Sequence, residues 1–154
     1  MVPVVLDSTR AEVYQTQASI VLRIPIGVAL KPFAAECLGQ GGLFDAPAGI
    51  AGYEWPVGSG QKLSVAELAN RNPLGPAGTK VALNKIGPYQ KTEGLAPAVV
   101  ASARIGTIDG MEDGEWVHEG YSTWTEYALH WNQRYPTSPW DLDPVSWVIK
   151  LVRL

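Results

Sequence analysis

The chain has little charge, one cysteine and only two histidines. Charged residues make up 18% of its 154 residues, and Cys37 is the single cysteine. One cysteine cannot form an intrachain disulfide, which argues against a small disulfide-stapled secreted domain. His118 and His130 stand in no Cys-x-x-Cys or paired-acid context. We therefore expect no metal ion, no cofactor and no catalytic residue.

Long apolar runs and basic leaders are also missing. No apolar stretch approaches the ~18 residues of a membrane span, so no membrane partner is expected. The first residues, MVPVVLDSTR, place no basic region ahead of the apolar ones. This predicts a protein made in the cytoplasm of the producing cell without a signal peptide. The acidic turn 109–115 resembles the start of a calcium loop, but Met111 and Gly120 stand where oxygen ligands are needed.

The charge that is present is segregated along the chain. Residues 62–104 carry six basic and two acidic side chains, a balance of +4. Residues 105–149 carry one basic and eight acidic side chains, a balance of −7. The acidic excess repels phosphate, so no nucleic-acid partner is expected. The two segments are either separate solvated faces or complementary patches that dock head to tail between subunits.

The hydrophobic pattern predicts mostly short strands. Residues 12–28 alternate in polarity as a strand does, and residues 79–86, 98–108, 115–121 and 145–154 also appear extended. The segment PFAAECL fits one helical turn, and a Gly/Pro-rich loop covers residues 39–60. Two capping boxes, at Ser64 and Thr123, each predict the start of a helix.

These elements predict one α+β domain over residues 1–154. We expect a sandwich-like or barrel-like arrangement of antiparallel strands, with one or two short helices on one face.

Tryptophan is concentrated near the C-terminus, where five of the six fall in the last 39 residues. Within the helix after Thr123, one face carries an aromatic stripe that predicts a buried side. Its members are Trp124, Tyr127, Ala128, Trp131 and Tyr135. Trp140 has no periodic context and stands between two prolines, which predicts a presented, partner-facing ring. We select Trp140, Trp55 and Trp116 as candidate partner-binding residues.

Low charge, segregated charge and the absence of catalytic motifs together favour a non-enzymatic structural subunit. We expect a virion-type coat, decoration or tail component that works through protein–protein contacts in a homo- or hetero-oligomeric particle. The alternative is a carbohydrate-binding module that stacks a glycan on Trp140 and Trp55. An enzyme ranks third.

Overall fold

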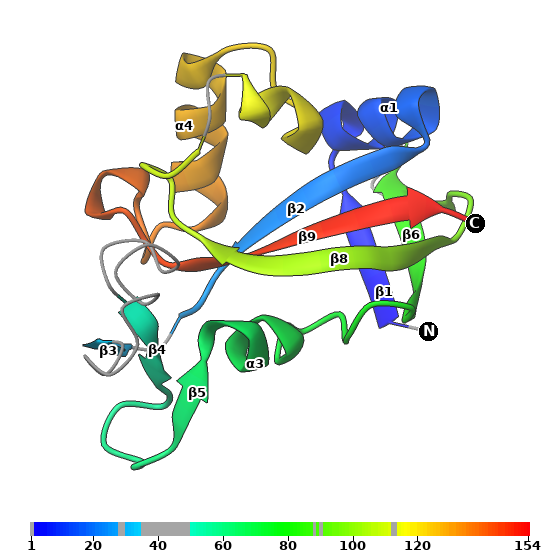
Figure 1. The fold of residues 1–154 in the computed structure, drawn as a ribbon. Helices are drawn as coiled ribbons and strands as arrows, with labels where there is room; N and C mark the ends of the chain where they lie inside the picture. The colour runs from blue at the N-terminus through cyan, green and yellow to red at the C-terminus, as the bar shows by residue number, and fades with distance from the viewer. Residues whose placement is uncertain (1, 28–29, 35–49, 88, 90, 112–113) are drawn as a thin grey trace.

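The computed structural model describes residues 2–27, 30–34, 50–87, 89, 91–111 and 114–154. It has the expected α+β fold, with helices and 3₁₀ turns around two sheets (Figure 1). The elements in chain order are β1 (Val2–Leu6), α1 (Ser8–Gln17), β2 (Ser19–Pro25), β3 (Lys31–Ala34), β4 (Ile50–Glu54), β5 (Lys62–Ser64), α3 (Val65–Asn70), β6 (Lys80–Ile86), β7 (Thr92–Gly94), β8 (Ala98–Gly106), η3 (Glu115–Glu119), α4 (Trp124–Arg134), η4 (Trp140–Leu142) and β9 (Ser146–Arg153).

The larger sheet has the order β1-β6-β8-β9-β2, and β7 also pairs with β6. β1 and β6 are parallel, while all other pairs in this sheet are antiparallel. β9 therefore lies between β8 and β2, and its residues Ile149 and Leu151 are fully buried. The smaller antiparallel sheet, β3-β4-β5, lies below the left-hand end of β8 in Figure 1.

The main core fills the space between the larger sheet, α1 and α3. α1 packs on β1, β2 and β6, whereas α3 packs on β8 and β4. Trp147 of β9 donates its Nε1 hydrogen to the carbonyl of Leu68, 2.8 Å away, and so ties α3 to the middle of the sheet. The predicted strands at 79–86, 98–108 and 145–154 are confirmed as β6, β8 and β9.

The predicted strand at residues 12–28 is wrong in its first half. Residues 12–17 belong to α1, and only Ser19–Pro25 form a strand. Asp7 caps the helix by accepting from the backbone N–H of Arg10, and the helix ends where Ala18 turns left-handed at φ 58°. The helix buries only Ala11 and Tyr14. Their tertiary contacts override the strand-like composition of this segment.

Both predicted helix starts are confirmed, and the capping box predicted at Ser64 is complete. Ser64 accepts from Glu67 N, and the Glu67 side chain accepts in return from Ser64 N, so α3 begins with a complete capping box. Thr123 accepts from Glu126 N at the start of α4. These caps satisfy backbone donors that the first turn of a helix leaves without partners.

The predicted return strand at 115–121 is wrong, because residues 115–119 form the 3₁₀ turn η3. Gly114 and Gly120 bracket this turn with left-handed φ values of 81° and 103°. A β-carbon at position 120 would lie 2.9 Å from Cγ of Arg10, so α1 leaves room only for glycine there. The turn directs the side chain of Glu119 into the protein, where it is buried. In a strand, successive side chains of this segment would instead have pointed to opposite faces.

The predicted helical turn at 32–38 and loop at 39–60 are corrected where the structure describes them. Residues 31–34 form β3, and residues 50–54 form β4 in the middle of the smaller sheet. Cys37 and residues 39–49 lie outside the described residues. Among the described helices, none combines the length and the apolar character that crossing a membrane requires.

A second, smaller core lies in a part of the fold that we call the aromatic lobe, formed by η3, α4 and η4. It appears at the upper left of Figure 1. The stripe predicted for the helix after Thr123 is confirmed as a packing face, since Tyr127, Ala128 and Trp131 are buried. Around the buried centre lie five partly buried residues. They are Met111, Trp116, Trp124, Tyr135 and Trp140.

Candidate functional site

The structure brings two of the three candidate tryptophans together and leaves the third apart. Trp116 and Trp140 both contact Trp124, with ring centroids 6.1 and 5.3 Å away. Trp55 lies instead in the main core, where its ring meets the edge of Trp147 at 6.0 Å. All three candidates are half-buried. Trp116 and Trp140 thus both belong to the aromatic lobe, and Trp55 belongs to another part of the molecule.

The segment that carries Trp140 is more ordered than its sequence suggests. Residues 140–142 form η4, and the backbone N–H of Trp140 donates to Oδ1 of Asn132, 3.0 Å away on α4. The Trp140 ring is nearly perpendicular to Trp124, at 85°. Leu142, two residues later, is 72% exposed. Trp140 is therefore held in place, with an exposed leucine beside it on the same turn.

Stacked aromatic rings keep the lobe rigid beneath this surface. Trp131 is 2% exposed and donates its Nε1 hydrogen to the carbonyl of Ser138, 2.8 Å away. Its ring stacks on Tyr127 at 6.1 Å, and Tyr127 stacks in turn on Trp124 at 5.8 Å. The row of rings connects the half-buried surface to the centre of the lobe. Ring pairs of this kind contribute about 0.5–1.5 kcal/mol each beyond their buried area.

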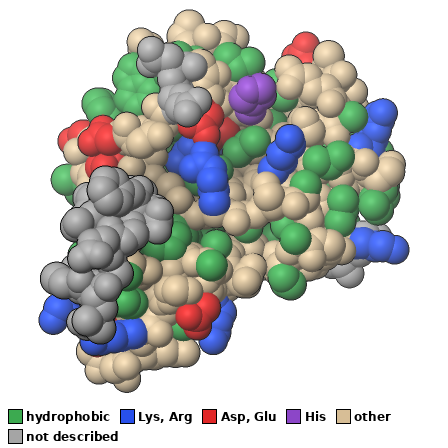
Figure 2. Space-filling model, in the orientation of Figure 1, with side chains coloured by type: hydrophobic (Ala, Val, Ile, Leu, Met, Phe, Trp, Pro, Cys, Tyr) green, Lys and Arg blue, Asp and Glu red, His purple; other side chains and the backbone are tan. Residues whose placement is uncertain are grey.

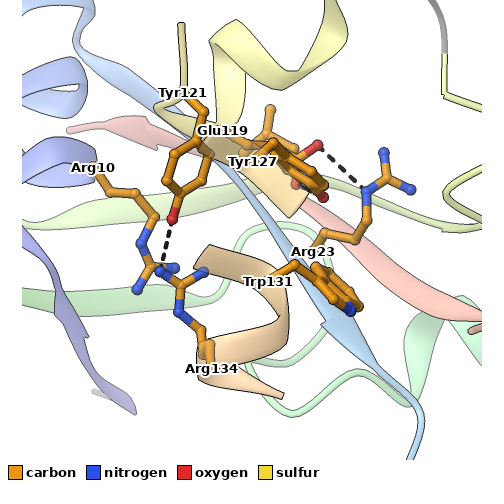
Figure 3. Close-up of a pocket in the computed structure, with 8 residues that line it drawn as sticks. Arg10, Arg23, Glu119, Tyr121, Tyr127, Trp131 and Arg134 are labelled. Atoms are coloured by element: carbon orange, nitrogen blue, oxygen red, sulfur yellow. Dashed lines mark hydrogen bonds and ion pairs between the residues drawn. The ribbon is translucent and has the colours of Figure 1, made fainter. Parts of the chain in front are cut away.

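Beneath the lobe, a buried ion pair connects it to the larger sheet (Figure 3). Arg23 of β2 donates from Nε to Oε2 of Glu119 at 3.3 Å, and from Nη1 to the carbonyl of Thr107 at 3.2 Å. Tyr127 of α4 donates its hydroxyl hydrogen to the other carboxylate oxygen, Oε1, at 2.9 Å. The side chains of Arg23 and Glu119 are only 1% and 4% exposed.

Burial controls the protonation of this group. Burial raises the pKa of Glu119 above its ordinary value, and the charge of Arg23 opposes but does not cancel that effect. Burial and the neighbouring Glu119 also raise the pKa of Tyr127, so its hydroxyl remains a proton donor throughout the physiological range. The arrangement holds a carboxylate between a cation and a fixed donor.

A second group of charges lies on the other side of the same lobe. Arg134 of α4 donates from Nη2 to the Tyr121 hydroxyl at 2.7 Å and to Oδ2 of Asp7 at 2.6 Å. Asp7 thereby caps α1 and holds the end of α4 at once. Arg10 Nε lies 3.3 Å from the same Asp7 oxygen but is not aligned for a hydrogen bond.

The cavity enclosed by these charges is too small for a substrate. It has a volume of about 10 Å³, and Arg10, Arg23 and Arg134, which are labelled in Figure 3, are among the residues that line it. That volume corresponds to roughly one water molecule. The two ionic groups instead connect the aromatic lobe to α1 and to β2.

Sequence reasoning missed this ionic link. Arg23 and Glu119 are 96 residues apart, and the sequence predicted an extended strand at residues 115–121. One local signal existed, since Arg23 is the single charge within the apolar alternation of β2. A lone charge in such a strand needs a partner when it is buried.

Some of the charges of the basic and acidic segments are paired with each other within the molecule. Arg104, from the basic segment, forms an ion pair with Glu115 of the acidic segment, and Arg23 lies 3.7 Å from the same carboxylate. Figure 2 shows Lys and Arg side chains along the lower and right-hand edges and at the centre, with carboxylates mainly in the upper half. The two signs thus remain unevenly distributed over this face, although some pairs are closed internally.

Within the described part of the chain, no three His, Cys, Asp or Glu side chains gather closely enough to hold a metal ion. Comparison with family models, with curated proteins and with solved structures finds no match to this chain. Function must therefore be argued from the surfaces described above.

Substitutions at Asp7 should separate its two roles. We expect Asp7→Ala to lower the free energy of unfolding by about 1–2 kcal/mol, since it removes both the helix cap and the half-exposed ion pair with Arg134. Asp7→Asn retains a capping oxygen and should cost less than Asp7→Ala. Urea denaturation at neutral pH checks the order, and equal losses in both variants would contradict the capping role.

The same pair predicts a pH effect. Burial works to raise the pKa of Asp7, but the hydrogen bond from Arg10 N and the charges of Arg10 and Arg134 outweigh it, so the pKa is lowered. A lowered pKa gives a stabilisation that is present above the ordinary value and is lost as the pH falls through the folded-state value. Asp7→Asn should therefore lose less stability than the parent on acidification below about pH 4.

Proposed function

We propose that this protein is a non-enzymatic structural subunit that assembles with other protein chains through its aromatic lobe. The nature of the particle, a virion-type coat, decoration or tail, rests on the sequence expectation alone. The structure contributes a rigid surface that suits protein–protein contact.

The observation that carries this proposal is the pair of half-buried tryptophans with exposed aliphatic neighbours. Trp116 is followed by Val117, which is 41% exposed, and Trp140 precedes Leu142, which is 72% exposed. Both tryptophans are fixed against Trp124. Large aromatic side chains that are already immobilised lose little entropy on binding, which is typical of interface anchors.

The charges around this surface favour a basic partner. Asp109 and Asp141 are exposed, and Glu126 lies in the first turn of α4. An acidic rim around an apolar centre attracts a complementary positive patch and speeds its approach. A second copy could supply one from its basic segment, residues 62–104, in a head-to-tail contact.

The test replaces Leu142 with glutamate. We expect Leu142→Glu to weaken assembly about ten-fold or more, because it places a charge at the apolar centre of the contact. Because Leu142 is largely exposed, the melting temperature should be nearly unchanged. Sedimentation velocity over a dilution series, repeated at low and high salt, measures both the assembly and its expected weakening by salt.

Leu129→Glu is the matched control. Leu129 is likewise exposed, at 56%, but it belongs to α4 and lies outside the buried stripe of that helix. It should leave assembly as in the parent. A protein that stays monomeric at high concentration, and that captures no partner from its native source, would overturn the proposal, as would equal effects of the two substitutions.

The carbohydrate-binding alternative receives less support from the geometry. It requires Trp55 and Trp140 on one platform, and the structure places them in separate clusters. A glycan panel is the direct check: binding that is lost in Trp140→Ala would favour that alternative over assembly.

A further inference from the structure

One face of the larger sheet points away from the main core, and we call it the open face. On the core side, Ala98, Val100, Leu151 and Ile20 are at most 1% exposed. Side chains alternate along a strand, so the residues between them lie on the opposite face. Figure 1 is viewed toward this opposite face, and none of the described helices is drawn in front of the middle of β8 and β9.

Two neighbouring rows of side chains cross the open face, in the register of the paired strands. The first row is Lys80, Val99, Val152 and Ser19, and the second row is Ser102, Lys150 and Val21. The three valines are half-buried, and both lysines are exposed. An antiparallel sheet with one solvated face normally has polar residues on that face. These rows instead place apolar side chains among basic ones, with no acidic side chain between them.

The next row of the same face has the acidic partners that these two rows lack. It is formed by Arg104, Val148 and Arg23, and it is partly covered by η3, which packs on β2. Carboxylates of η3 form ion pairs with both arginines of this row. Among the described residues, by contrast, no carboxylate forms an ion pair with Lys80 or Lys150. The two rows thus combine apolar surface with unpaired positive charge.

The aromatic lobe has the complementary combination. Asp109 and Asp141 are exposed on it, Glu126 lies in the first turn of α4, and Leu142 is 72% exposed. An apolar centre with acidic neighbours matches a face whose apolar centre has basic neighbours. The lobe is fixed against β2 of its own molecule by the buried ion pair with η3. A lobe that covers the open face therefore has to belong to a second copy.

We propose that the open face binds the aromatic lobe of a second copy of this chain. This inference rests on the proposed function, because it names the surface to which the lobe binds. Leu142 packs on the valines of the two rows, and the acidic side chains around it lie against Lys80 and Lys150. Two different surfaces meet in this contact, so each pair of copies retains one free lobe and one free face. Copies therefore add head to tail, into a ring or a filament.

Charge reversal on the open face tests this contact. We expect Lys80→Glu/Lys150→Glu to weaken self-association about ten-fold or more in sedimentation velocity, because the new carboxylates repel the acidic lobe. Since both lysines are exposed, the melting temperature should be nearly that of the parent. Lys62→Glu/Lys91→Glu is the matched control. It makes the same change in net charge at two exposed lysines outside these rows, and it should assemble as the parent does.

Mixing two defective variants gives a second readout. Leu142→Glu retains an intact open face, and Lys80→Glu/Lys150→Glu retains an intact lobe. At a concentration where neither variant assembles alone, we expect the mixture to form one-to-one dimers. These dimers should grow no further, because one intact contact joins the two copies and their remaining surfaces are both blocked. A contact between two lobes would give no such dimers.

The inference is overturned if the parent does not self-associate, if the two double variants assemble equally well, or if the mixture forms no dimers. The outcomes also separate it from the proposed function. If Leu142→Glu weakens assembly and Lys80→Glu/Lys150→Glu does not, the lobe still mediates assembly, but it binds a different surface. If Leu142→Glu assembles as the parent does, the proposed function itself fails.

Discussion

Trp131→Ala should lower the free energy of unfolding by about 3–5 kcal/mol, the largest effect we expect from a single apolar side chain. Trp131 is 2% exposed at the centre of the aromatic lobe. Its removal leaves a cavity beside Tyr127 and Tyr135, which both contact the ring, and deprives the carbonyl of Ser138 of its donor. Urea denaturation followed by circular dichroism measures the loss.

Leu129→Ala is the control for Trp131→Ala, since it truncates an exposed residue of the same helix. It should change stability by less than about 0.5 kcal/mol. An unchanged denaturation midpoint in Trp131→Ala would show that the aromatic lobe contributes nothing to the cooperative unit. The stripe would then have to be interpreted as a binding face.

Arg23→Met should cost about 3–5 kcal/mol near neutral pH, because it leaves the Glu119 carboxylate buried without its cation. Adding Glu119→Gln should recover much of that loss, since the double variant buries no charge and still offers Tyr127 an acceptor oxygen. A double variant that is as unstable as Arg23→Met would show that packing of the arginine, rather than its charge, is what matters.

The cost of Arg23→Met should also depend on pH. Because burial raises the pKa of Glu119, its stabilising contribution is present at low pH and is lost as the pH rises toward the folded-state value. Arg23 is the main influence that holds this pKa down, so the variant should have a still higher one. The stability difference between parent and variant should therefore widen from about pH 4.5 to pH 7. A constant difference would contradict the charge argument.

Features encoded by local rules were predictable from the sequence. The caps at Ser64 and Thr123 depend on a side chain and a backbone N–H three residues apart, and both are present. The buried face of α4 follows from helical spacing, and Trp131 lies at its centre. In each case the physical partners are neighbours in sequence.

Features decided by distant contacts were not predictable in the same way. Residues 12–17 have the β-branched and aromatic content of a strand, yet Tyr14 is buried as part of α1, with its hydroxyl 2.6 Å from the carbonyl of Ala96. Residues 115–119 form a 3₁₀ turn that places Glu119 against Arg23, a partner 96 residues away in the chain. Trp140 could be selected as a candidate from the sequence. Its contact with Trp124 could not be predicted, because it depends on how η4 packs beside α4.

The position of β9 has a consequence for how the chain is made. A ribosome that has passed Gly106 has already produced β2 and β8, but not the strand that joins them. Until Ser146–Arg153 emerge, both strands have an edge with unpaired backbone groups, which can pair with other chains. Nascent chains should therefore depend on chaperones late in synthesis, and any truncation before Ser146 should yield aggregates instead of a smaller folded core.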